Sequence, residues 1–134
     1  MAQLPSVRRH VSELGIADSV IFTGLRSDIG VLLSAMDAFC LPSRFEGLGI
    51  ALIEAQANGL PCLSSDHIPS EVKILPTHRQ LSLHDPANRW ADTLLSFSSE
   101  RFKNPENLVT KHGFNIEYEA RMLVDRYQKI TGEL

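Results

Sequence analysis

The feature that most constrains the fold is an alternation of strand-like and helix-like segments in the middle of the sequence. Residues 38–41 and 60–65 have the length and composition of strands, and residues 49–58 between them have helical spacing. A strand–helix–strand unit is connected by a right-handed crossover, which makes its two strands parallel. The runs lack polar alternation, which is typical of strands that are buried on both faces. The sequence therefore predicts an α/β fold, a parallel sheet with helices on both faces.

The remaining elements are predicted from apolar spacing and from the positions of glycine and proline. We expect strands at 19–24 and 81–83, and helices at 4–14, 27–36, 86–97, 99–111 and 116–131. The signal is weaker after residue 65. The sequence contains no internal repeat and no linker long enough to divide it, so residues 1–134 are predicted to form a single domain that ends in the helix 116–131.

The composition excludes several classes of protein. The 134 residues are 43% hydrophobic and 22% charged, with a formal net charge of −3, which is typical of a globular protein. The sequence has no basic block, so nucleic acid is not an expected partner. It has no apolar stretch long enough to span a bilayer and no signal peptide at its start. We expect a cytoplasmic location, either free or peripheral at the inner face of the membrane.

Cysteine and histidine give no indication of a cross-linked or metal-binding protein. Cys40 and Cys62 both lie in strand-like runs, and two cysteines form no framework in a cytosolic chain. We expect both to be reduced, buried thiols. The five histidines show no ligand spacing with Cys, Asp or Glu, so no metal site is predicted.

Two carboxylates, Glu46 and Glu54, lie eight positions apart across the pair Gly47 and Gly49. Ligands of parallel α/β sheets bind at the carboxyl ends of the strands, where we expect the loops 24–27, 42–49 and 65–69. Glycines let the backbone approach a ligand, and the N-terminus of the helix that begins near Gly49 favours a phosphate. Glu54 lies about 8 Å along that helix, so the two carboxylates can reach different parts of one ligand. Carboxylates are strong acceptors for the hydroxyls of a ribose or a hexose.

A purely structural interpretation of this pair is also open. A glutamate within a helix is normally exposed to solvent, and the glycines can simply form a tight turn. However, Ile50, Ile53 and Ala57 share a helical face beside Glu54, which predicts that Glu54 is partly buried. A partly buried carboxylate is costly unless a donor satisfies it.

Several short motifs occur together in register. Pro42-Ser43 and Glu46-Gly47 are followed by Glu54-Ala55, Gly59-x-Pro61 and Ser65-Asp66, after an upstream run at residues 14–24 and 35–39. Over residues 4–75 this order resembles the C-terminal, donor-binding domain of family 4 retaining glycosyltransferases, enzymes with a two-domain GT-B fold. The tail, with residues 81–83 and Trp90-Ala91, is similar to members that build exopolysaccharide or capsule. The resemblance implies a Rossmann-like domain, the C-terminal half of a GT-B fold.

The resemblance also implies roles for individual residues. Glu46 is the implied catalytic residue, in contact with the hydroxyls of the donor sugar, and Glu54 is implied to hold the ribose of the nucleotide. The other implied donor-binding residues are Gly47, Leu48 and Gly49, whose backbone N–H groups face the sugar and the diphosphate, Ser43 alongside them, and Gly24 and Leu25 against the base. The implied donor is a nucleotide diphosphate sugar, a UDP-sugar, and transfer needs no metal ion or other cofactor.

The sequence departs from the family pattern in the elements that normally precede the motifs named above. The family's domain normally begins with another strand, a basic pair for the diphosphate and a Gly-Asp-Gly strand end, and an acceptor domain comes before these; we expect all of them to be missing here. Lys73, Arg26 and Arg44 are nearby basic residues, and for each we expect a solvated surface charge.

These departures predict a truncated donor-binding domain that is inactive without the missing N-terminal domain or a partner subunit. The alternatives are a non-catalytic α/β module that binds a nucleotide or a partner, and a half-domain that forms homo-oligomers through an exposed sheet edge.

Overall fold

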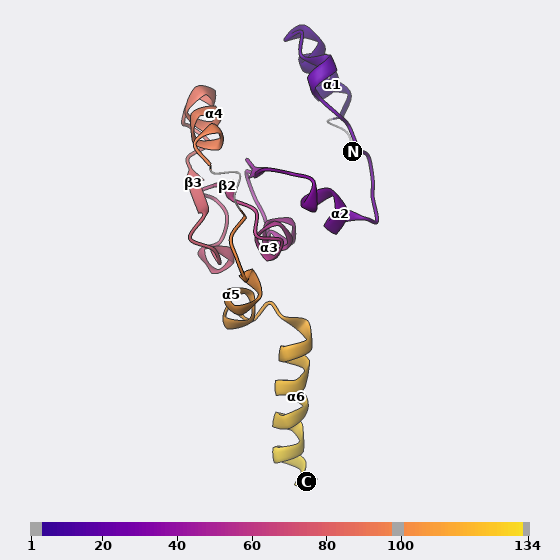
Figure 1. The fold of residues 1–134 in the computed structure, drawn as a ribbon, viewed down its shortest axis with the longest axis vertical. Helices are drawn as coiled ribbons and strands as arrows, with labels where there is room; N and C mark the ends of the chain where they lie inside the picture. Colours follow the sequence, from indigo (N-terminus) through magenta and orange to yellow (C-terminus); the bar gives the residue numbers. More distant parts are fainter. Residues whose placement is uncertain (1–3, 98–100, 133–134) are drawn as a thin grey trace.

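The structure is a computed structural model that describes residues 4–97 and 101–132. Three short parallel strands form the centre of its fold (Figure 1). The strands are β1 (Phe39–Leu41), β2 (Cys62–Ser65) and β3 (His78–Leu81), in the spatial order β1-β2-β3. Phe39 pairs with Cys62, and Leu63 pairs with Arg79. All four residues of the central strand β2 are buried. The predicted parallel α/β sheet is therefore confirmed.

Helices precede, connect and follow the strands. The structure contains α1 (Leu4–Glu13), α2 (Ile29–Ser34), α3 (Ile50–Ala57), α4 (Ala87–Leu95), α5 (Pro105–Lys111) and α6 (Ile116–Thr131), with short 3-10 turns at Ala17–Ser19 and Ser70–Val72. Within the described residues, no helix is long and apolar enough to cross a membrane.

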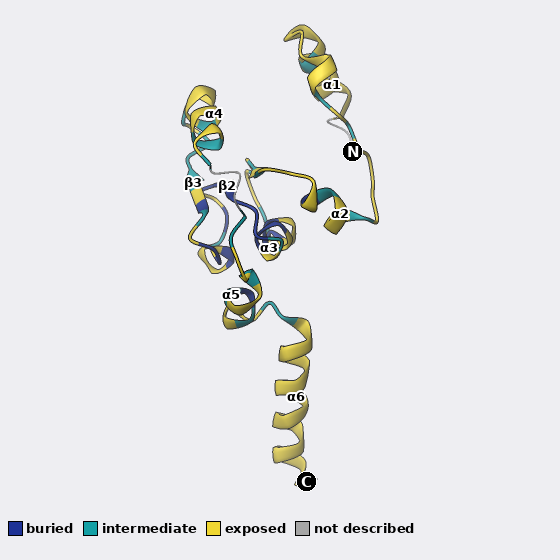
Figure 2. Cartoon of the chain, viewed as in Figure 1, coloured by how far each residue is buried: buried dark blue, intermediate teal, exposed yellow. Residues whose placement is uncertain are grey.

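The core lies on one face of the sheet, where α3 packs against β1 and β2 and α5 packs against α3 (Figure 2). Alternate strand residues face this side, and they join the buried cluster made by Leu33, Leu52, Ile53, Ala55, Leu60, Cys62, Ile68, Val72, Ile74, Leu75 and Val109. On the opposite face, Arg79 donates to the Ser96 hydroxyl and stacks over the Phe97 ring just after α4. Helices therefore flank the sheet on both sides.

Gly59 fixes the turn between α3 and β2. Its φ is +78°, and a Cβ at this position would lie 2.7 Å from the carbonyl oxygen of Phe102. The Phe102 amide also donates to the Gly59 carbonyl at 2.9 Å. Only glycine lets the segment at Phe102 approach the end of α3 this closely.

The expected strand at 19–24 is absent from the described structure. Residues 20–24 are irregular, Ile21 is 87% exposed, and no described strand pairs with this segment. A strand needs a neighbour for its backbone N–H and C=O groups, and here the segment runs between α1 and α2, away from the sheet (Figure 1). The Phe22 ring instead packs against the Arg8 guanidinium of α1, 4.1 Å from its centroid.

The third strand lies three residues earlier than predicted, at His78–Leu81 instead of 81–83. Its sequence is mostly polar, and its register is set by pairing with β2, so apolar composition pointed to the wrong residues. The helices at 4–14, 27–36, 49–58, 86–97 and 99–111 are confirmed with shorter bounds, although 98–100 lie outside the described residues.

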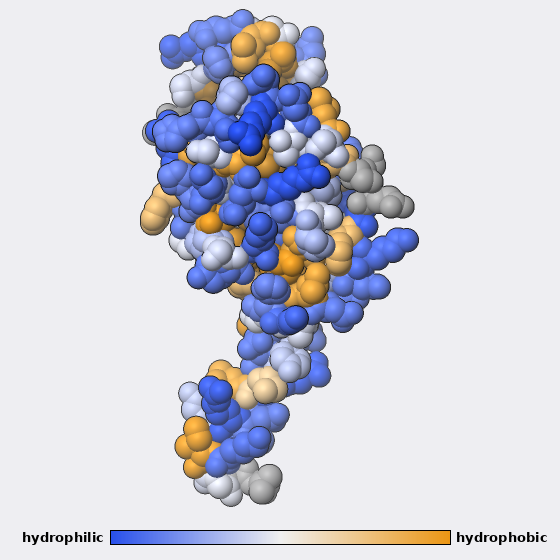
Figure 3. Space-filling view, turned by 90° about the vertical axis from the view of Figure 1, so that its left-hand side faces the viewer, coloured by the Kyte–Doolittle hydropathy of each residue, from blue (hydrophilic) through white to orange (hydrophobic). Residues whose placement is uncertain are grey.

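The helix expected at 116–131 is confirmed at both ends, because its end signals are local. The Asn115 side chain accepts from the Tyr118 amide at its start, and Gly132 closes it with φ +73°. The helix projects from the rest of the molecule (Figure 1), and apolar atoms gather on its surface at the lower end of the space-filling view (Figure 3).

The cysteines differ in their environments. Both are free thiols, as predicted, and Cys62 is buried, which raises the pKa of its thiol to about 12. Cys40 is exposed, so its predicted burial is wrong. It lies on the edge strand β1, on the face opposite Phe39 and Leu41, where it is left uncovered.

Candidate functional site

The loop between β1 and α3 carries the first predicted glutamate at the carboxyl edge of the sheet. The Ser43 hydroxyl donates to Oε1 of Glu46 at 2.7 Å and also lies 3.2 Å from the Phe45 carbonyl. Both Ser43 and Glu46 are half-buried. The contact with Ser43 fixes one carboxylate oxygen of Glu46.

The end of β2 holds the same loop. The hydroxyl of Ser65, which is fully buried, donates to the carbonyl oxygen of Ser43. Ser65 is the last residue of β2, and Ser43 lies just after the neighbouring parallel strand β1. The carboxyl ends of parallel strands meet at one edge. Two of the predicted edge loops, 42–49 and 65–69, are therefore joined.

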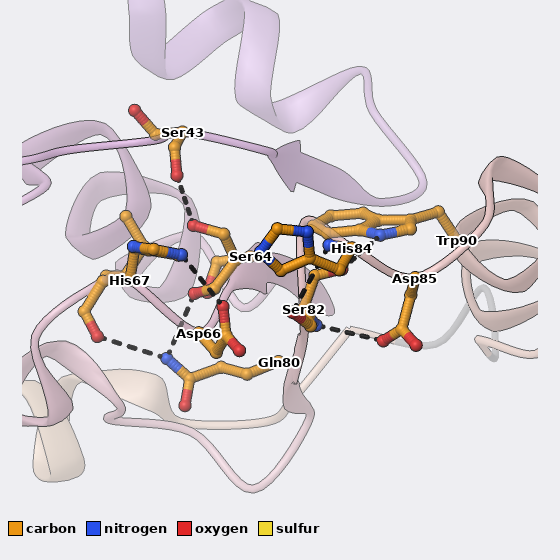
Figure 4. A network of polar contacts seen from close by, with 11 residues as sticks. Ser43, Ser64, Asp66, His67, Gln80, Ser82, His84, Asp85 and Trp90 are labelled. Carbon is orange, nitrogen blue, oxygen red and sulfur yellow. Dashed lines mark hydrogen bonds and ion pairs between the residues drawn. The ribbon is translucent and has the colours of Figure 1, made fainter.

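The strand β3 supports the second of these loops. Gln80 Nε2 lies 3.4 Å from the carbonyl oxygens of both Ser65 and Ile68, and the Asp66 amide donates to the Leu81 carbonyl. Asp66 and His67 are half-exposed above it, with 3.7 Å between Oδ1 and Nε2 (Figure 4). This arrangement gives the edge a second carboxylate besides Glu46.

Gly49 starts α3 beside Glu46. It is the residue before the helix, is buried, and has a left-handed backbone with φ +78°. The first amides of a helix have no intrahelical partner, and here they belong to Ile50 and Ala51. Gly47 and Leu48, in the same loop, are exposed. This end of α3 can therefore accept an anion next to the Glu46 carboxylate.

The second predicted glutamate lies elsewhere on α3. Glu54 is exposed, so its predicted partial burial is wrong. It lines a cavity of about 310 Å³ between α2 and α3, together with Ile29, Gly30, Leu33, Ala57 and Asn58. Glu46 does not line this cavity, so the two carboxylates lie at separate sites.

The predicted base-binding residues Gly24 and Leu25 lie in the exposed segment before α2. Leu25 is 88% exposed, and the Gly24 carbonyl accepts from its neighbour Thr23. Next to them, the Arg26 guanidinium binds both carboxylate oxygens of Asp28 and lowers the pKa of that carboxyl. In the described part of the chain, no hydrogen bond joins Gly24 or Leu25 to the loop 42–49.

Gln56 was not predicted, and it explains which face of α3 is buried. Its Nε2 donates to the Val72 carbonyl at 2.7 Å, and its Oε1 accepts from the amides of Ile74 and Leu75 at 3.0 and 2.9 Å. A glutamine that satisfies backbone groups can be fully buried at low cost. It therefore turns Leu52, Ala55 and Gln56 toward the core and Glu54 toward solvent.

Arg101 is a second residue that sequence reasoning missed. One guanidinium nitrogen donates to the carbonyl and side-chain oxygens of Asn58, at the end of α3. The other donates, at 2.8–2.9 Å, to three carbonyls at the end of α2, those of Leu33, Ser34 and Met36. This one side chain therefore satisfies carbonyls at the ends of both helices that line the Glu54 cavity.

The first residue of β3, His78, is a buried histidine. His78 Nε2 is 2.8 Å from the Ser64 hydroxyl, while its Nδ1 is buried without a partner. Burial, and secondarily the charge of Lys73, lowers the pKa of His78 to about 4. His78 is therefore neutral near pH 7.

Comparison with known proteins identifies a family that matches most of the chain. The profile of the family described as "Glycosyl transferases group 1" matches residues 3–112. The match includes the loop with Ser43 and Glu46, the helix with Glu54, and Arg101, and it ends before α6.

Individual relatives align over parts of the chain. EpsF of Bacillus subtilis (strain 168) is 37% identical over 89 residues, which are 66% of this chain and 23% of EpsF. The lipopolysaccharide core biosynthesis mannosyltransferase LpsB of Rhizobium meliloti (strain 1021) is 26% identical over 92% of this chain and 38% of its own length. The Vi polysaccharide biosynthesis protein VipC/TviE of Salmonella typhi is 41% identical over 43% of this chain and 10% of its own. The chain thus spans well under half the length of each of these relatives.

Proposed function

The chain belongs to the family of group 1 glycosyl transferases, and we propose that it is the donor-binding part of a retaining glycosyltransferase. The enzyme transfers a sugar from a nucleotide diphosphate sugar, a UDP-sugar, to a glycan or lipid-linked acceptor. The names of LpsB and VipC/TviE point to bacterial polysaccharide synthesis, and we assign the chain to the synthesis of exopolysaccharide or capsule.

The observation that carries the proposal is the contact between Ser43 and Glu46 beside the first amides of α3. Ser43 occupies one carboxylate oxygen of Glu46, which leaves the other to accept from a sugar hydroxyl. The free amides and the positive end of α3 favour binding of the diphosphate at the start of the helix, next to Glu46. Glu46 thus takes the donor sugar, and the backbone of Gly47, Leu48 and Gly49 takes the phosphates. Because the positive end of α3 stabilises part of the negative charge of the phosphates, sugar transfer needs no metal ion.

We assign Glu54 to the ribose of the nucleotide. In the described structure its carboxylate has no ion pair and no hydrogen bond, so both oxygens are available to vicinal hydroxyls. A role in capping or in a salt bridge within the fold finds no support there. The nucleotide has to extend from the Glu46 loop along α3, and its base lies against Gly24 and Leu25.

Catalysis also requires a site for the acceptor. Because the chain spans 23% of EpsF and 38% of LpsB, we propose that the acceptor side comes from an N-terminal domain or a partner subunit. Alone, the chain binds the donor without turnover, in the cytoplasm or at the inner face of the membrane.

The test compares Glu46→Gln and Glu54→Gln in calorimetric titrations with UDP and with UDP-glucose. We expect wild type to bind UDP weakly, near 1 mM, or about −4 kcal/mol. Glu54→Gln should weaken UDP several-fold, whereas Glu46→Gln should weaken UDP-glucose and leave UDP unchanged. Glu106→Gln, an exposed glutamate in α5, is the matched control.

Three outcomes would overturn the proposal. They are no binding of any nucleotide at saturation, unchanged UDP binding in a destabilised Glu54→Gln, and equal effects of both variants on UDP. Turnover by the isolated chain would exclude the alternative of a non-catalytic module and the proposed need for a partner.

A further inference from the structure

The two walls of the Glu54 cavity belong to separate helices, α2 and α3 (Figure 1). The wall from α2 consists of Ile29, Gly30 and Leu33, and the wall from α3 consists of Glu54, Ala57 and Asn58. The helix α3 packs in the core, but of the six residues of α2 only Leu33 is buried. A helix this short is not stable on its own in water. The position of α2 therefore depends on the contacts that connect it to α3.

Hydrogen bonds between the ends of the two helices make this connection. The Asn58 side chain donates to the Ser34 hydroxyl at 3.2 Å, which joins the end of α3 directly to the end of α2. Arg101 reinforces the same contact, because one guanidinium nitrogen binds Asn58 and the other binds three carbonyls at the end of α2. A guanidinium is a rigid, planar fork, so these bonds fix the spacing of the two helix ends.

The backbone beside Arg101 is itself held against α3. The Phe102 amide donates to the Gly59 carbonyl at 2.9 Å, and a Cβ at Gly59 would lie only 2.7 Å from the Phe102 carbonyl oxygen. Arg101 therefore reaches α2 from a fixed point at the end of α3. A shift of α2 away from α3 breaks the bonds of its guanidinium.

The segment assigned to the base is connected to the same helix. Residues 24–25 lie shortly before α2, and the Asp28 carbonyl accepts from the Val31 amide in the first turn of the helix. The carboxylate assigned to the ribose, Glu54, lies on α3. A nucleoside that contacts both parts therefore spans the connection that Arg101 maintains.

We propose that Arg101 is a positioning residue of the nucleotide site, a role that rests on the proposed function. It holds the end of α2 on the end of α3 and so keeps the base-binding segment at a fixed distance from Glu54. Arg101 does not line the cavity, so it acts on the nucleotide through α2 and Asn58. The coupling is reciprocal, and a nucleotide that bridges the two helices stabilises the bonds of Arg101.

NMR titrations of the full chain with UDP test the proposal. In wild type, we expect UDP to shift the amide signals of α2 together with those of α3 and of the loop 42–49. Arg101→Lys should bind UDP about fivefold more weakly or worse, and its α2 signals should no longer shift when those of the loop do. A variant that is merely less stable has a smaller folded fraction, so it would lose all of these shifts in proportion.

Two further variants separate positioning from folding. Ser34→Ala removes the acceptor of the Asn58 side chain at an exposed position, and alanine is a better helix former than serine. This variant should be as stable as wild type and yet bind UDP about twofold to threefold more weakly. Arg89→Lys, in an exposed ion pair with Asp85, is the matched control for Arg101→Lys and should leave UDP binding unchanged.

The outcomes distinguish this proposal from the donor site itself. If Arg101→Lys binds UDP as tightly as wild type, the positioning role is wrong and the donor site stands. The same conclusion follows if UDP shifts the loop 42–49 and α3 in wild type but leaves α2 unchanged, because the nucleotide then does not bridge the two helices. No binding of UDP by wild type would overturn both proposals.

Discussion

The hydroxyl of Ser65 donates to the carbonyl oxygen of Ser43 and thereby connects the ends of β2 and β1. The Ser43 side chain in turn binds Glu46 at 2.7 Å. Ser65 is fully buried, so it acts on Glu46 only through the loop that it anchors. The orientation of the proposed sugar-binding carboxylate therefore depends on a residue of another strand.

The first prediction concerns Ser65→Ala. It leaves the Ser43 carbonyl without its donor, which should cost about 1–2 kcal/mol of unfolding free energy. With the loop released, affinity for UDP-glucose should fall by about threefold to tenfold while affinity for UDP changes less. Urea denaturation and calorimetric titration measure the two effects. Ser12→Ala, on the exposed face of α1, is the control, and an equal loss for both ligands would contradict a role through Glu46.

The second prediction concerns acid stability and His78. Its pKa is about 4 in the folded protein against an ordinary 6.5, so between these values the unfolded chain binds the proton and the folded chain does not. Stability is therefore fully present above about pH 6.5 and is lost as the pH falls toward about 4. Between about pH 7 and pH 4.5 this histidine should account for about 2 kcal/mol of lost stability.

Urea denaturation of wild type and His78→Gln at both pH values measures this contribution. The variant should lose less stability on acidification than wild type does. His10→Gln, an exposed histidine on α1, should behave like wild type. Parallel pH curves for wild type and His78→Gln would refute the prediction.

The third prediction concerns Arg101→Lys. An ammonium group is a point charge and cannot reach the carbonyls of two helix ends at once as the planar guanidinium does. We expect a loss of about 1–3 kcal/mol, because exposed and part-buried carbonyls at the ends of α2 and α3 lose a charged donor. Hydrogen exchange should show faster opening of α2, and urea denaturation gives the total. Arg89→Lys, in an exposed ion pair with Asp85, should cost no more than about 0.5 kcal/mol.

Sequence patterns predicted the elements whose determinants are local. The bounds of α6 follow from Asn115 and Gly132, which cap it without help from the rest of the chain. The strand β2 was predictable because its run is buried on both faces. The contact between Ser43 and Glu46 joins residues three apart, and the predicted edge loop 42–49 lies at the carboxyl end of β1, as the structure has it.

Elements that depend on distant partners were not predictable in this way. Residues 19–24 have a strand composition but no neighbouring strand in the described structure, and β3 takes its position from pairing with β2. Glu54 was assigned to a half-buried face from the spacing of Ile50, Ile53 and Ala57. The buried face instead includes Gln56, which is satisfied by the backbone of Val72, Ile74 and Leu75. Arg101 lies more than forty residues from every group that it binds.

That separation has a consequence for how the chain matures during synthesis. The carbonyls of Leu33, Ser34 and Met36 leave the ribosome 65–68 residues before Arg101 does. At about 5–20 residues per second, the end of α2 waits several seconds without the donors that Arg101 supplies. Locking of α2 against α3 through Arg101 is thus a late event in biogenesis, which waits until the segment after α4 has been translated.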